Sequence, residues 1–177
     1  MSDVSQKGFT LIEMIVYIAI VGVIGGILIS FLADSFKSYN KVQAMQQVFN
    51  NTDGSLRIIT DEIKYAKSLY TPTSVFDNDS GQLSLETALN APVGENTAFV
   101  DYYLDNGRIY EKRDGTSTEP LTSERVFISA LRFSSVAVSG KNSVSVKITG
   151  RINTASTRPE DQASLTLNST AALRGAY

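Results

Sequence analysis

The first third of the chain carries one unbroken apolar block and then a periodic one. From Met14 to Ala33 there are twenty residues without a charge, about the length that an α-helix needs to cross a hydrocarbon core of roughly 30 Å. After this block, mainly apolar residues recur at alternating steps of three and four, which is the spacing of one face of an α-helix. That stripe consists of Val42, Met45, Phe49, Thr52, Leu56, Ile59, Ile63, Ala66 and Tyr70.

Together the two blocks predict one helix from Phe9 to Leu69, roughly 90 Å long if it is continuous. We expect it to stop at Thr71-Pro72, because the residue before a proline disfavours helical dihedral angles. The glycines at positions 22, 25 and 26 and the segment Asn50–Gly54 are two places where the helix can bend or locally unfold.

The periodic stripe has two interpretations. The favoured one is a core face on which a β-sheet packs, and the other is a coiled-coil seam for another subunit. The charged residues on the opposite side predict a solvated surface with no functional role. They are Arg57, Asp61, Glu62, Lys64 and Lys67.

After Pro72 the pattern changes to short alternating runs separated by turn residues, which predicts an antiparallel β-sheet head. The strongest signal is Asp105-Asn106-Gly107, a hairpin turn between strands at Ala98–Leu104 and Arg108–Arg113. The chain is thus expected to be α+β, with a long N-terminal helix packed on this sheet. Further strands are expected at Gln82–Leu85, at Val126–Val138 with an interruption near Ser134, at Ser143–Ile152 after a Ser139–Asn142 turn, and at Ala163–Leu167, with a surface loop over Gly150–Gln162.

The amino-acid composition excludes several kinds of catalytic and binding site. The 177 residues include no cysteine, histidine or tryptophan, which removes thiol and imidazole catalysis, disulfides and the usual zinc ligand sets. Sixteen basic and eighteen acidic residues are dispersed along the chain, so no basic stripe indicates nucleic-acid binding. We therefore expect no enzyme, no cofactor, no metal site and no nucleic-acid partner.

One segment has the partial pattern of a calcium loop. Asp77-Asn78-Asp79-Ser80-Gly81 spaces two carboxylates before a glycine, but position 88, where an EF-hand needs a bidentate glutamate, is Ala88. These residues are also the ones that turns favour, so a polar surface turn is the better interpretation.

Glu13 stands directly before the apolar block and needs an explanation. Burying a carboxylate at mid-membrane costs about 2.5 kcal/mol or more on insertion scales, so the side chain must reach the interface or meet a partner. A monomeric anchor whose Glu13 reaches the cytoplasmic interface is one solution. Assembly beside another chain that supplies a cation is the other.

The stretch Lys7-Gly8-Phe9-Thr10-Leu11-Ile12-Glu13 resembles the start of type IV prepilins and type II secretion pseudopilins. The resemblance implies a leader, Met1–Gly8, which prepilin peptidase removes by cutting between Gly8 and Phe9. It further implies N-methylation of Phe9 and a role for Glu13 in subunit assembly. In an assembly of parallel helices, the Glu13 carboxylate can neutralise the Phe9 amine of its own chain, at i and i+4, or that of a neighbour.

The head resembles those of minor pilins and of the J-type minor pseudopilin in three segments, LRIITDEIKYAKSL, YYLDNGRIYEK and PLTSERVFISALRFSS. The implied organisation is a leader at 1–8, a transmembrane and assembly half of the helix at 9–33, an amphipathic half at 34–71 and a β-rich head at 72–177. The implied partners are prepilin peptidase, other pilin or pseudopilin subunits, an inner-membrane assembly platform and membrane lipid.

These implications define a minor subunit of a type IV pilus or type II secretion filament. It would cross the cytoplasmic membrane once, with its N-terminus in the cytoplasm and its head outside, before entering the filament. Two alternatives remain open at this point, a major filament subunit and a monomeric membrane-anchored binding module.

Overall fold

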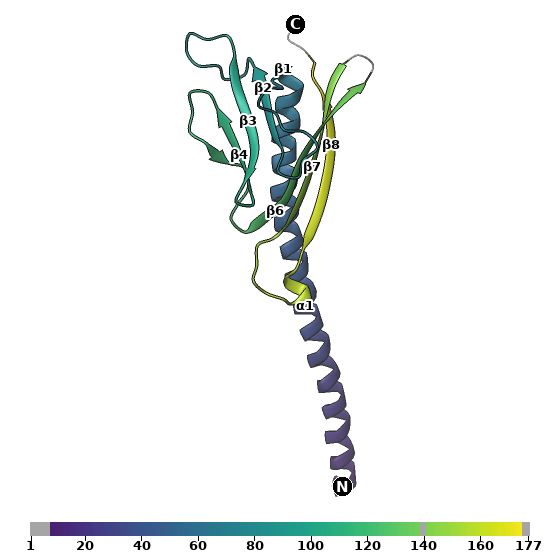
Figure 1. Cartoon of the computed structure of the whole chain (residues 1–177). Coiled ribbons are helices and arrows are strands. Elements are labelled where there is room, and N and C mark those ends of the chain that lie inside the picture. The colour runs from purple at the N-terminus through teal and green to yellow at the C-terminus, as the bar shows by residue number, and fades with distance from the viewer. Residues whose placement is uncertain (1–7, 139–140, 175–177) are drawn as a thin grey trace, which may run out of the picture. The chain divides into compact units, whose positions relative to one another are not determined.

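The computed structural model describes residues 8–138 and 141–174. Helix α1, Leu11–Tyr65, is the first element (Figure 1). The chain divides into two compact units, Met1–Asn40 and Lys41–Tyr177, and α1 contributes residues to both. The helix continues without interruption through the glycines of the apolar block and through the Asn50–Gly54 segment. Residues 1–7 of the expected leader lie outside the described part of the chain.

The helix ends at Tyr65, earlier than the predicted end at Leu69 to Thr71. Residues Ala66–Leu69 form strand β1 instead. Their backbone pairs with strand β2, Gln82–Thr87, with Leu69 opposite Leu85. The sequence contains no helix stop at Tyr65, so this boundary is set by pairing with a strand distant in sequence rather than by Pro72.

The first sheet has five antiparallel strands in the order β1-β2-β3-β4-β5. Strands β3, Ala98–Asp105, and β4, Arg108–Arg113, form the predicted hairpin. Asn106 and Gly107 at its tip have φ of 46° and 74°, the positive values that a two-residue type I′ turn requires. Strand β5, Glu119–Pro120, adds a short edge.

The second sheet has three antiparallel strands in the order β6-β7-β8. Strand β6, Val126–Val138, is continuous through Ser134, and its irregularity is a bulge between Ile128 and Ala130. The predicted turn over Ser139–Asn142 falls partly on residues 139–140, outside the described chain, and β7 already begins at Lys141. The remaining elements are β7, Lys141–Ile152, the short 3-10 helix η1, Pro159–Asp161, and β8, Ser164–Ala172.

Both sheets share one hydrophobic core with the second half of α1 (Figure 1). Val48, Ile59 and Ile63 of the helix are fully buried with side chains from both sheets. This confirms the core interpretation for the stripe from Thr52 to Ala66. Its earlier members, Val42, Met45 and Phe49, remain exposed at 38 to 55%, so the stripe is only partly covered within its own chain.

Gly150 is where strand β7 comes closest to α1. A Cβ atom at this position would lie 2.8 Å from Thr52 Oγ1 and 3.2 Å from Ile128 Cδ1. The predicted surface loop over Gly150–Gln162 is therefore wrong at its start, because residues 150–152 belong to β7 and Gly150 is buried. The absence of a side chain is what allows the strand to approach the helix.

We expect Gly150→Ala to lower the free energy of unfolding by about 1–3 kcal/mol, since the methyl group has no room between β7 and α1. Gly54→Ala is the matched control, because nothing lies within 4 Å of its Cβ position. Alanine inside a helix should stabilise it by about 0.5–1 kcal/mol relative to glycine. Thermal unfolding of the detergent-solubilised chain measures both changes, and equal effects of the two substitutions would contradict the close approach.

Candidate functional site

The described chain begins with Gly8, Phe9 and Thr10, which are exposed and precede the first helical residue, Leu11. Nothing lies within 4 Å of a Cβ built on Gly8, and its φ is not in the left-handed region. Neither packing nor backbone conformation in this structure therefore requires glycine at position 8. A requirement imposed by another protein, such as a peptidase with a narrow cleft, is a separate reason for a residue without a side chain.

Glu13 takes part in a reciprocal cap at the start of α1. The Thr10 backbone N–H donates to Glu13 Oε2 at 3.5 Å, and the Glu13 N–H donates to Thr10 Oγ1 at 3.3 Å. This is a capping box, in which two unpaired N–H groups of a helix start are satisfied by side chains three residues apart. Both distances are long for hydrogen bonds, so the exposed carboxylate is held only loosely.

The sequence contains the capping box as Thr-x-x-Glu before an apolar run, but the sequence analysis considered only the membrane interface and subunit assembly for Glu13. The two roles are compatible, because a carboxylate in the first turn also complements the positive end of the helix dipole. The structure places all three predicted site residues, Gly8, Phe9 and Glu13, in this exposed N-terminal segment. The Phe9 side chain is 76% exposed.

The apolar side chains that follow are uncovered. From Leu11 to Ala33 the described residues are exposed, except for half-buried Gly25, and Val48 is the first buried residue of the helix. Among the described residues, α1 is the single helix that is long and apolar enough to cross a membrane. A helix of this kind must be covered by lipid or by neighbouring helices rather than by water.

Comparison with known proteins agrees with this picture. Residues 4–29 match the model of the prokaryotic N-terminal methylation motif. The fold is similar to that of a type IV-like pilin from Thermus thermophilus, with a TM-score of 0.50 and 9% sequence identity, over 70% of this chain and 95% of that one. No curated protein matches the chain by sequence.

The chain carries the prepilin methylation motif and has the fold of a type IV-like pilin. Its methylation motif and its fold, a long apolar helix packed on antiparallel sheets, indicate a structural subunit and not an enzyme. The resemblance inferred from Lys7–Glu13 is thereby confirmed at the level of the motif and the fold.

A buried ion cluster fastens the pilin-like head to its helix. Arg113 Nη2 on β4 lies 2.9 Å from Glu62 Oε2 on α1 and 3.3 Å from Glu111 Oε1, with the Arg113 and Glu62 side chains only 10% exposed. The Tyr102 hydroxyl donates to the other Glu111 oxygen at 3.3 Å, and Arg113 Nη1 donates to the Leu89 carbonyl at 2.9 Å. Glu62 is thus not part of the solvated surface predicted from the sequence.

Burial shapes the ionisation of this cluster. It raises the pKa of the Tyr102 phenol well above its usual range, and the nearby Glu111 and Glu62 charges raise it further. Burial by itself lowers the pKa of Arg113, but the hydrogen bond and the charge of Glu62 outweigh it, so the net shift is upward. The arginine therefore remains a cation between two carboxylates, while Tyr102 remains a neutral donor.

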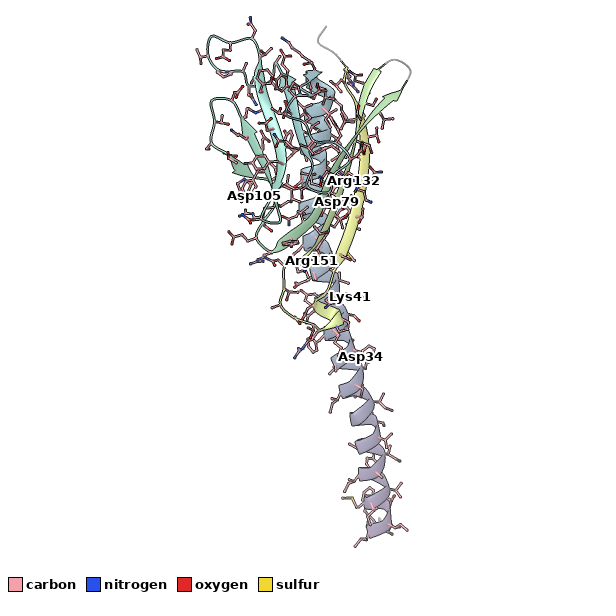
Figure 2. All side chains as sticks on the ribbon, viewed as in Figure 1. Asp34, Lys41, Asp79, Asp105, Arg132 and Arg151 are labelled. Carbon is pink, nitrogen blue, oxygen red and sulfur yellow. The ribbon has the colours of Figure 1, made fainter. Side chains whose placement is uncertain are left out.

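The Asp77–Gly81 segment is a docking loop for strand β6. Asp79 Oδ1 lies 2.8 Å from Arg132 Nη2, and Asp77 accepts a hydrogen bond from the Ser134 hydroxyl. Figure 2 labels Asp79 and Arg132 on the head. The Leu131 N–H donates to the Asp79 carbonyl at 2.7 Å, and the Gly81 N–H donates to the Leu131 carbonyl at 2.8 Å. Both carboxylates are therefore engaged with β6, which favours the turn interpretation over the calcium loop.

We expect Arg113→Met to lower the free energy of unfolding by about 3–5 kcal/mol, because it leaves two carboxylates buried without their cation. Arg57→Met is the control, since the Arg57 side chain is 75% exposed in its pair with Asp53 and should contribute about 0.5 kcal/mol or less. Chemical denaturation of the two variants tests the difference, which should vanish if the cluster is not structural.

Proposed function

We propose that this type IV pilin-like protein is a minor pilin or pseudopilin, a low-copy subunit of a type IV pilus or type II secretion filament. The observation that carries the proposal is an uncovered apolar helix that begins with a carboxylate, Glu13, inside a matched prepilin methylation motif. Prepilin peptidase cuts between Gly8 and Phe9, and the new amine of Phe9 is methylated. The helix then anchors the chain in the cytoplasmic membrane, with the head outside the cytoplasm.

The role of Glu13 in this proposal is electrostatic. After cleavage the Phe9 amine is a cation that, in a filament, is surrounded by apolar helices, where an unpaired charge is strongly disfavoured. The Glu13 carboxylate of the same or a neighbouring chain neutralises it. Before assembly, the loose capping box with Thr10 keeps the carboxylate at the helix start.

The proposal that this chain is a minor subunit rests on the resemblance of its head segments and on the number of contact surfaces that a filament subunit needs. A repeating subunit must present complementary surfaces above and below itself, whereas a subunit at a filament tip or in an initiation complex needs only one of them. The rest of such a head is then available for a partner, and the assembly platform and the other pilins are the expected partners in the membrane.

We expect Glu13→Ala to insert into the membrane as well as the unchanged chain or better, because it removes a charge from an apolar segment. Its incorporation into filaments should fall by about tenfold or more, since a buried amine loses its counter-charge. Membrane fractionation and quantitative mass spectrometry of sheared filaments measure the two effects separately.

Thr10→Ala is the control for this experiment, because it removes the capping hydroxyl and keeps the carboxylate. It should weaken the first helical turn by about 1 kcal/mol and leave incorporation nearly normal. Normal incorporation of Glu13→Ala, or equal defects in the two variants, would contradict the pairing role.

The proposed rank predicts that the chain is far less abundant in sheared filaments than the major subunit, and that deleting its gene strongly reduces the number of filaments. Quantitative mass spectrometry and electron microscopy provide these two measurements. If the chain is the most abundant pilin in purified filaments, it is the major subunit.

A further inference from the structure

Most edge strands of the two sheets are protected from pairing with a strand of another chain. The β5 edge is two residues long and ends in Pro120, and β1 is four residues long with an irregular register between Ala66 and Ser68. The outer edge of β6 is occupied by the Asp77–Gly81 loop and by the Gly107 carbonyl, which accepts from the Ile128 N–H at 2.8 Å. Short strands, proline, bulges and covering loops are the usual means by which proteins protect such edges.

Strand β8 has none of these protections. It pairs with β7 in an unbroken register from Ser164 to Ala172, and the sequence from Ala163 to Leu173 contains no charge, proline or glycine. Figure 1 shows β8 as the outermost strand of its sheet. An uncharged and regular edge of this length is a ready template for another strand.

The hydrogen-bond pattern shows which groups face outward. The Ile152 N–H donates to the Ala163 carbonyl at 2.9 Å, and the Leu173 N–H donates to the Asn142 carbonyl at 3.0 Å. In an antiparallel ladder, hydrogen-bonded and non-hydrogen-bonded residues alternate along each strand. The odd-numbered residues of β8 therefore bond to β7, whereas the backbone N–H and C=O groups of the even-numbered residues point away from it. Within the described chain these outward groups have no hydrogen-bond partner. The outward-facing residues, all of them exposed, are Ser164, Thr166, Asn168, Thr170 and Ala172.

The charged residues in the three strands of the sheet that ends in β8 are all basic. These strands contain no aspartate or glutamate. Lys147 and Arg151 lie on the solvent-facing side of β7, directly opposite Asn168 and Ser164, and neither forms an ion pair with a residue that the structure describes. Figure 2 labels Arg151 on this part of the head. An incoming strand therefore meets a basic surface.

We propose that the open edge of β8 binds an extended strand of another pilin-like chain, one with acidic residues on its solvent-facing side. The inference rests on the proposed function, because parallel anchoring in one membrane brings different heads beside one another. A second copy of this chain is disfavoured as the occupant, since pairing β8 with β8 joins two basic sheets. Backbone hydrogen bonds supply affinity in this mode of binding, and side chains on alternate positions supply specificity.

Photo-crosslinking of the full chain in its native membrane tests the proposal. A photo-reactive amino acid at position 170 should join the chain to a second protein that carries the prepilin methylation motif, with the crosslink mapped to an extended, acidic segment of that protein. Thr166→Pro removes one outward N–H and leaves the ladder to β7 intact, so the crosslink yield should fall about fivefold. Ser117→Pro, in the exposed connection between β4 and β5, is the matched control and should not change the yield.

Lys147→Glu is a second variant that keeps the whole ladder. It should also lower the yield about fivefold at low salt and less at high salt, whereas Lys112→Glu, an exposed lysine on the other sheet, should have no effect. A thermal unfolding midpoint like that of the unchanged chain establishes that each variant is folded.

Three outcomes would overturn the inference: no crosslink at position 170, a crosslink to a second copy or to a protein without the motif, or a yield unaffected by both Thr166→Pro and Lys147→Glu. The proposed function is monitored separately by recovery of the chain in sheared filaments. Recovery in filaments without a crosslink at β8 contradicts this edge as a docking site and leaves the subunit role standing.

Discussion

The apolar side chains of α1 between Leu11 and Ala33 are exposed in the part of the chain that the structure describes, and the proposed function follows from the need to cover them. Removing a leucine or isoleucine side chain from water contributes roughly 1.5–3 kcal/mol, and this segment contains many such residues. Lipid can cover them in the membrane, and neighbouring helices can cover them in an assembly. A charge at the start of such a segment is tolerable only when it reaches water or meets an opposite charge. The Glu13 carboxylate therefore needs either the membrane interface or a cation.

The head of the proposed subunit meets the opposite requirement, because it must be stable outside the membrane. It folds two antiparallel sheets around the second half of α1, so that Ile59 and Ile63 become the centre of its core. The Glu62–Arg113–Glu111 cluster then fixes the position of the first sheet on the helix, and Gly150 allows β7 of the second sheet to approach Thr52. A polar cluster of this kind needs all its partners in place, so it also favours one arrangement of helix and sheet over others.

The sequence was most informative where structure is determined locally. The apolar block, the hairpin at Asp105–Arg108 and the core face from Thr52 to Ala66 depend on nearest-neighbour spacing and on turn residues, and each was predicted correctly. The helix end at Tyr65, the burial of Glu62 and the burial of Gly150 depend on contacts with strands far away in the sequence. No pattern within α1 distinguishes Glu62 from the exposed Asp61, because its partner Arg113 is fifty-one residues away.

The central claim is that this pilin-like chain is processed and assembled through its N-terminus. Intact-mass analysis of the protein extracted from native membranes and from sheared filaments tests it most directly. The account predicts a mature chain that begins at Phe9 and carries one additional methyl group on the Phe9 amine. Assembled protein that retains Met1–Gly8 would contradict it.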